Sequence, residues 1–227
     1  MHQHHAPDTA RGQSHRKPMP LPITRSQTHR MAQWMKQHFG AQMEAATRGT
    51  PFSTDLVCAI ACQQAAYLVE GWIGRYDTAT ILARCVFDAS GDVAGHIRLV
   101  HPQNTQVFRN EWGDDFADML IAEGNLMRAM RDPPLAPAHI VYKGYGLFRY
   151  GLENVAADTA FFREKQWASF DACLARLLGE LRTNYTTMSM NLRDAVGACS
   201  GGSGSSIGIR AFRDHVFTFV EWCSEVK

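Results

Sequence analysis

The sequence contains no apolar run that approaches the roughly 18 residues of a membrane-spanning helix. Its first 27 residues also lack the apolar segment of a secretory signal peptide. These absences argue against a membrane span and against a cleavable signal within the given sequence. We therefore expect a soluble protein with no signal peptide, either cytoplasmic or exported by a non-classical route.

The chain has no strong excess of charge of one sign, with 23 Lys and Arg against 22 Asp and Glu. The first 30 residues hold five of the basic residues and one acid, so the remainder is mildly acidic. A nucleic-acid-binding fold would carry its basic stripe on the folded part, so we expect no nucleic-acid partner. The basic tail could instead dock to an acidic partner.

The chain has six cysteines, and at 227 residues it is too large to need disulfide staples. Without a signal peptide, the six cysteines are predicted to be buried thiols. Cys58 and Cys62 stand one helical turn apart, but no second Cys or His pair at ligand spacing accompanies them. We therefore expect no metal site and no cofactor.

The patterns of composition and periodicity predict one mainly α-helical domain. Residues 1–23 mix His, Pro, Ser and Arg with few large apolar residues, which predicts a disordered basic tail. Residues 24–227 show repeated apolar spacing of three to four. We expect helices from about Ser26, after the N-cap chemistry of residues 53–55, over 77–86, over 104–131 with a break near Gly113 or Gly124, over 167–181, over 192–196 and over 212–223. A short β or extended segment is expected near residues 139–152, which are aromatic and rich in glycine.

Three pieces of the chain carry a functional hypothesis. The first is AIACQQAAY, residues 59–67, in which Gln64 falls on the buried face of a predicted helix. The second is GYGLFRYGL, residues 144–152, and the third is GACSGGSG, residues 197–204. In order and spacing these pieces resemble the lysozyme-like superfamily, in particular the helical domain of bacterial lytic transglycosylases and related peptidoglycan hydrolases. The resemblance covers about residues 50–223.

The resemblance implies a lysozyme-like helical domain that acts on the bacterial cell wall, with peptidoglycan or a related amino-sugar glycan as its partner. Gln64 stands where the family has its catalytic glutamate, Arg149 where it has a glutamine, and Ala198–Cys199 where it has a Tyr-Asn pair. The residues that would contact the glycan are Tyr67, Tyr145, Gly146, Phe148 and Cys199.

Glycoside cleavage needs a carboxylic acid that protonates the leaving oxygen, and a primary amide cannot supply that proton near neutral pH. The altered motifs therefore predict a pseudoenzyme that binds glycan strands. Arg149 would bring a positive charge near Gln64, which favours an anionic ligand and depresses the pKa of a neighbouring acid.

Two other functions stay open. The chain could be an active muramidase or lytic transglycosylase, a glycoside hydrolase in the broad sense, that uses another carboxylate or whose natural residue at position 64 is glutamate. The candidate acids are Asp88, Asp92 and Glu153, although capping of the next element is the plainer interpretation of Asp88 and Asp92. Alternatively, Gln64 is a buried glutamine bonded to backbone, Tyr67 or Tyr145, and the protein is a helical interaction module. A groove that contains Gln64, Arg149 and Tyr145 together would favour the glycan hypotheses.

Overall fold

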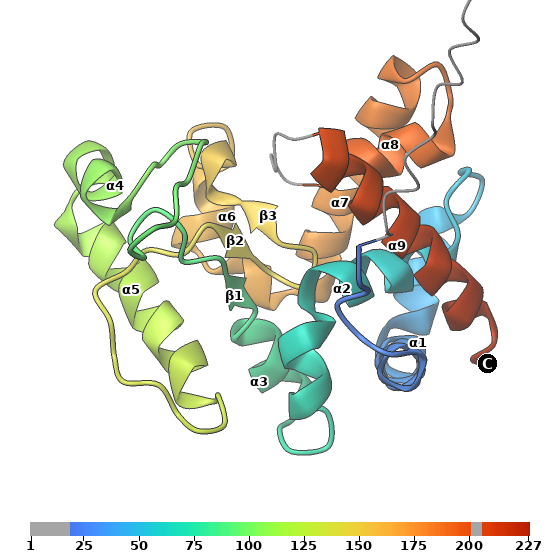
Figure 1. Ribbon diagram of the computed structural model, residues 1–227, viewed down its shortest axis with the longest axis horizontal. Coiled ribbons are helices and arrows are strands. Elements are labelled where there is room, and N and C mark those ends of the chain that lie inside the picture. Colours follow the sequence, from blue (N-terminus) through green and yellow to red (C-terminus); the bar gives the residue numbers. More distant parts are fainter. Residues whose placement is uncertain (1–18, 201–205) are drawn as a thin grey trace, which may run out of the picture.

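The computed structural model describes residues 19–200 and 206–227 (Figure 1). Within these residues the chain is mainly helical, which confirms the predicted fold class. The helices are α1 (Arg25–Thr47), α2 (Thr54–Val69), α3 (Thr78–Ala83), α4 (Thr105–Trp112), α5 (Asp114–Ala129), α6 (Thr159–Arg163), α7 (Phe170–Thr187), α8 (Leu192–Ala198) and α9 (Ser206–Ser224). Short 3-10 turns lie at Glu70–Trp72, Leu152–Asn154 and Gln166–Ala168.

Local capping explains where the first two helices begin. Thr24 and Gln27 form a capping box before α1, with the Thr24 backbone N–H donating to Gln27 Oε1 at 2.9 Å. Ser53 Oγ accepts a hydrogen bond from the Leu56 N–H at 3.1 Å, which confirms the predicted N-cap of α2.

Helix α2 is the central helix of the fold. Eleven of its 16 residues are buried, and it packs mainly against α9 and α1. A helix that is apolar almost all round needs partners on several sides, which α1 and α9 supply. All six cysteines are buried free thiols, as predicted, and Cys58 and Cys62 lie on α2.

A small antiparallel sheet lies beside α2 in the order β1-β2-β3 (Figure 1). Strands β2 (Gly144–Tyr145) and β3 (Tyr150–Gly151) fall within the expected extended segment, and Gly144 pairs with Gly151. Strand β1 (Val86–Phe87) corrects the predicted helix over 77–86, because α3 ends at Ala83. Pairing of Val86 with Tyr145 supplies β1 with partners that no local sequence signal reveals.

The long helical region over 104–131 is broken at Gly113, whose φ of 87° separates α4 from α5. Gly124 does not break the helix. It lies inside α5, where a Cβ would come within 2.7 Å of the Tyr142 ring, so its role is close packing. Figure 1 places α4 and α5 at one end of the molecule, with α8 and α9 at the other.

The folded part begins before residue 24, which corrects the predicted boundary. Ile23 is buried in the core, and the Met19 carbonyl lies 3.2 Å from His215 Nε2 on α9. The predicted disorder of residues 1–18 lies outside the described residues.

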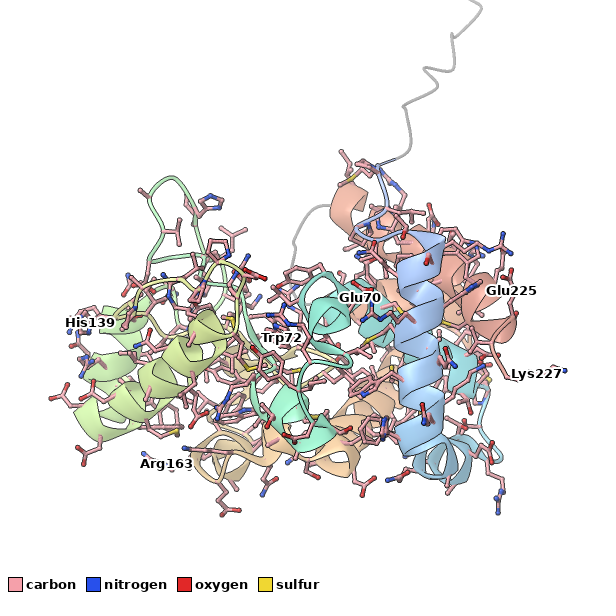
Figure 2. The ribbon with its side chains drawn as sticks, turned by 90° about the horizontal axis from the view of Figure 1, so that it is seen from below. Glu70, Trp72, His139, Arg163, Glu225 and Lys227 are labelled. Atoms are coloured by element: carbon pink, nitrogen blue, oxygen red, sulfur yellow. The ribbon has the colours of Figure 1, made fainter. Side chains whose placement is uncertain are left out.

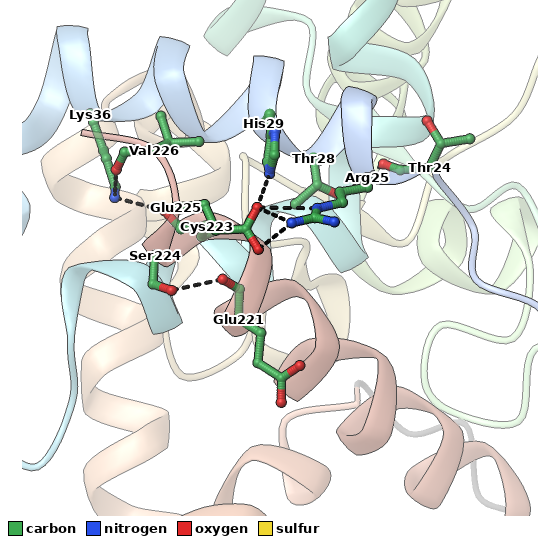
Figure 3. Close-up of polar contacts among 10 residues, drawn as sticks. All are labelled: Thr24, Arg25, Thr28, His29, Lys36, Glu221, Cys223, Ser224, Glu225 and Val226. Carbon is green, nitrogen blue, oxygen red and sulfur yellow. Dashed lines mark hydrogen bonds and ion pairs between the residues drawn. The ribbon is translucent and has the colours of Figure 1, made fainter.

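The C-terminal segment is held against α1 by charged contacts (Figure 3). The Glu225 carboxylate accepts hydrogen bonds from Arg25 at 2.6 Å and lies 2.9 Å from His29 Nε2. Lys36 Nζ donates to the Cys223 carbonyl at 2.9 Å and to the Val226 carbonyl. None of the described helices combines the length and the apolar character needed to cross a membrane.

Candidate functional site

A cavity of about 320 Å³ is lined by residues of α2, of the sheet and of the loop that joins β1 to α4. It brings together Gln64 and Arg149, the two residues predicted at the catalytic position, with Asp88, one of the candidate acids. The lining residues are Gln64, Asp88, Ser90, Ile97, Arg98, Leu99, Lys143, Gly144, Arg149 and Ser200.

The sheet positions the charged part of this cavity. Asp88 follows β1 directly, and Gly144 in β2 lies between Asp88 and Arg149 because β1 pairs with β2 and β2 with β3. A Cβ on Gly144 would stand 3.2 Å from the Cβ of Arg149 and 3.4 Å from its Nε. The missing side chain at Gly144 therefore leaves room for the Arg149 side chain to cross the strand.

Asp88 and Arg149 form a loose ion pair, with 3.7 Å between Arg149 Nη2 and Asp88 Oδ2. Both residues have a positive φ, 66° and 54°, a conformation that costs free energy outside glycine and that gathers at functional sites. Asp88 Oδ1 accepts a hydrogen bond from the Ser90 N–H at 3.0 Å. The Arg149 guanidinium also lies 5.9 Å from the centre of the Phe87 ring.

These contacts keep Asp88 ionised. Partial burial works against the charged form, but hydrogen bonds from Ser90 and the positive charges of Arg149 and Lys143 outweigh it and lower the pKa of Asp88. A carboxyl whose pKa is lowered holds no proton to donate near neutral pH. Asp88 is therefore unsuited to general-acid work, and the predicted effect of Arg149 on a neighbouring acid is seen here.

Gln64 is only 7% exposed and lines the cavity. Within residues 19–200 and 206–227, its carboxamide makes no hydrogen bond. The hydroxyl of Tyr145 is buried without a partner in the same ranges, so it does not satisfy Gln64. Gln64 therefore makes none of the bonds to backbone, Tyr67 or Tyr145 that the core-glutamine interpretation expects, and its donors and acceptor remain available to a ligand.

The loop between β1 and α4 contributes a residue pattern that the sequence analysis missed. Ile97 and Leu99 are 80% and 76% exposed, whereas Arg98 between them is 3% exposed. Arg98 is fixed by hydrogen bonds to the Pro102 carbonyl at 3.2 Å and the Val141 carbonyl at 3.0 Å. The sequence signal for this pattern is the alternation of apolar and polar residues in HIRLV, residues 96–100, but alternation alone does not predict which face meets the cavity.

The cavity carries more positive than negative charge. Arg98, Lys143 and Arg149 line it, and Asp88 is its one acidic lining residue within the described chain. Tyr67 lies close by without lining the cavity; it is 48% exposed, and its ring centre is 6.0 Å from that of Phe87. Partial burial raises the pKa of Tyr67, and the charge of Arg149 opposes that shift.

Four of the predicted glycan contacts are structural residues instead. Tyr145 is fully buried and packs on Phe162 and Trp167, because its strand faces the core. Gly146 forms a tight turn with a φ of 77°. Phe148 is buried, with its ring 6.0 Å from Phe170, and Cys199 is buried with its thiol donating to the Ala195 carbonyl. The predicted groove with Tyr145 in its wall is therefore corrected to a cavity without Tyr145.

The other candidate acids, Asp92 and Glu153, do not line this cavity. Asp92 accepts hydrogen bonds from the Thr105 N–H at 3.0 Å and from its hydroxyl at 2.9 Å, at the first residue of α4, whose N-cap is Asn104. Glu153 lines a separate cavity of about 570 Å³ together with Glu180 and Arg176. Glu70, in the turn after α2, is the nearest carboxylate to Gln64 along the sequence, but it pairs with Arg30 at 3.1 Å and lies beside α1 (Figure 2).

Among the described residues, no group of three or more His, Cys, Asp or Glu side chains is placed to hold a metal ion. Comparison of the chain with protein-family models, curated proteins and solved structures finds no match. The lysozyme-like resemblance therefore stays a prediction, and the function is argued from the cavity.

Proposed function

We propose that this protein binds peptidoglycan or a related amino-sugar glycan strand in the Gln64 cavity and does not cleave it. The supporting observation is the position of Gln64, which lines the cavity with an unengaged carboxamide beside an ionised Asp88 and the guanidinium of Arg149.

The chemistry of the cavity favours binding over cleavage. A carboxamide can donate to and accept from sugar hydroxyls, but it carries no transferable proton near neutral pH. The neighbouring Asp88 has a lowered pKa and is held by Ser90. General-acid catalysis contributes about 10² to 10⁴-fold to such reactions, so its loss leaves at most trace turnover.

The test uses bacterial sacculi and three forms of the full chain. The protein, the Gln64→Glu variant and the Gln63→Glu variant are incubated with sacculi, which are then sedimented, and soluble muropeptides are separated by chromatography. Gln63 lies on the same helix but does not line the cavity, so its variant controls for the added charge. Circular dichroism verifies that each variant is folded.

We expect all three forms to sediment with sacculi and only Gln64→Glu to release muropeptides. Its activity should rise as the pH falls from 7 to 5, since the positive charges of Arg149 and Lys143 lower the pKa of an acid placed there. Release of muropeptides by the unchanged protein would mean that another carboxylate acts as the general acid. Failure of the unchanged protein to sediment would contradict the proposal and leave a helical interaction module.

A further inference from the structure

The charged lining of the cavity holds more cations than carboxylates. Among its described lining residues, Arg98 and Arg149 carry guanidinium groups and Asp88 is the single carboxylate. Asp92, which does not line the cavity, also acts on the charge of Arg98, whereas Arg149 has Asp88 as its ion-pair partner. The Arg149–Asp88 distance of 3.7 Å is longer than a hydrogen bond, so the two groups attract each other without a directed contact.

Arg149 has donor capacity to spare. A guanidinium offers five N–H donors in a fixed fork, and within the described residues Arg149 has Asp88 as its one ion-pair partner. Asp88 is already committed elsewhere, because its Oδ1 accepts from Ser90 at 3.0 Å. A second carboxylate could therefore engage the fork of Arg149 in the bidentate geometry that Asp88 does not adopt.

Arg98 gives the cavity a second cation, which is buried, and an apolar rim. Its Nε is buried with no hydrogen-bond partner in the described part of the chain, whereas its two Nη atoms bind backbone carbonyls. Because those bonds pin Arg98 inward, Ile97 and Leu99 stand exposed at the cavity. A ligand group that fits is anionic with an apolar flank.

We infer that the cavity recognises a carboxylate-bearing substituent of the glycan, held by Arg149 in competition with Asp88, with its alkyl flank against Ile97 and Leu99. This rests on the proposed function and adds its ligand class: a glycan strand carrying acidic lactyl-peptide substituents, in preference to the neutral sugar backbone. In bound protein, the ligand carboxylate replaces Asp88 as the main partner of Arg149.

The test compares two soluble probes by calorimetric titration of the full chain. One is a neutral N-acetylglucosamine tetramer, and the other is a muropeptide whose peptide ends in free carboxylates. Two cavity variants are used, Arg149→Gln and Asp88→Asn. Asparagine keeps the oxygen that Ser90 binds and tolerates the positive φ of Asp88, so the fold is preserved.

Matched controls come from a second loose ion pair outside the cavity. Arg75 and Asp132 are 3.6 Å apart, and neither lines the cavity. Arg75→Gln and Asp132→Asn therefore make the same changes in charge and side-chain shape without touching the site. Ionic strength is kept equal in all titrations, since salt screens such interactions.

We expect the muropeptide to bind roughly tenfold more tightly than the neutral tetramer, as a hydrogen bond to a charged group permits. Arg149→Gln should remove that preference, and Asp88→Asn should strengthen muropeptide binding about fivefold, because the competing carboxylate is gone. The control variants should match the unchanged protein.

Two outcomes separate the two proposals. Equal binding of both probes that is insensitive to Arg149→Gln and Asp88→Asn would overturn the carboxylate inference and leave glycan binding intact. Failure of both probes, together with failure to sediment with sacculi, would overturn the proposed function itself.

Discussion

Gly146 offers the sharpest test of how the turn between β2 and β3 is built. Its φ is 77°, its N–H donates to the Cys85 carbonyl at 2.8 Å, and its carbonyl accepts from the Arg149 N–H at 2.9 Å. A Cβ at this position would overlap the Sγ of Cys173 and stand 3.4 Å from Trp167. Gly146→Ala therefore combines backbone strain with overpacking in the core.

The two penalties can be worked out separately. An L-residue in the left-handed region costs about 1–2 kcal/mol, and forcing an extra carbon into a packed core costs about 1–3 kcal/mol. We expect Gly146→Ala to lower the free energy of unfolding by about 2–5 kcal/mol. For a chain of this size, that corresponds to a fall in Tm of roughly 10 °C.

Urea unfolding followed by circular dichroism measures the effect, with two matched variants. Gly74 has a φ of 81° and nothing within 4 Å of the methyl that alanine would add, so Gly74→Ala should show the strain alone, about 1–2 kcal/mol. Cys173→Ala removes the Sγ, so the double variant Gly146→Ala/Cys173→Ala should recover part of the loss. The coupling should reach about 1–2 kcal/mol, as for residues in direct contact.

Either of two results would refute this reasoning. If Gly146→Ala costs no more than Gly74→Ala, the predicted overlap with Cys173 does not exist. If the double variant is as unstable as the sum of its two single changes, the clash lies with another group and the turn is packed differently.

Three further predictions concern other parts of the molecule. Glu123→Gln should lower the free energy of unfolding by about 3 kcal/mol, because it removes the carboxylate that lies 2.5 Å from Arg84 Nη1 and 2.6 Å from Lys165 Nζ. As a control, Glu111→Gln removes an exposed ion pair with His101 and should change the free energy of unfolding little. The six thiols should not react with iodoacetamide at pH 7 until the protein unfolds, because they are buried and because burial raises the pKa of Cys173 to about 12. Rapid labelling of the native protein would contradict their burial. Because the pKa of Asp88 is lowered in the folded protein, its ionised carboxylate stabilises the fold at pH values above 3.8, the pKa of the unfolded carboxyl, and this stability is lost as the pH falls below 3.8 through the folded pKa. The unchanged protein should therefore lose more free energy of unfolding than Asp88→Asn between pH 4 and pH 2. Parallel losses in the two proteins would refute this assignment.

Much of the helical framework could be predicted from local patterns. The three-to-four spacing of apolar residues and the cap at Ser53 are local properties of the chain, and so they identify α2 and place Gln64 on its buried side. Gly113 likewise breaks its helix because glycine tolerates a φ of 87° without help from tertiary contacts. The burial of the cysteines followed from the apolar character of a free thiol and from a chain too long to need disulfides.

Only the tertiary structure decided which side chains surround Gln64. Strand β1 exists because Val86 pairs with Tyr145, nearly 60 residues later in the chain, and that pairing brings Asp88 to Arg149. The same sheet turns Tyr145 into the core, although its aromatic neighbourhood in the sequence resembles a sugar-binding surface. Periodicity reports which face of an element is apolar, but the partners of a polar side chain depend on contacts distant in sequence. The chemistry of the cavity therefore became visible only when the sheet joined those segments.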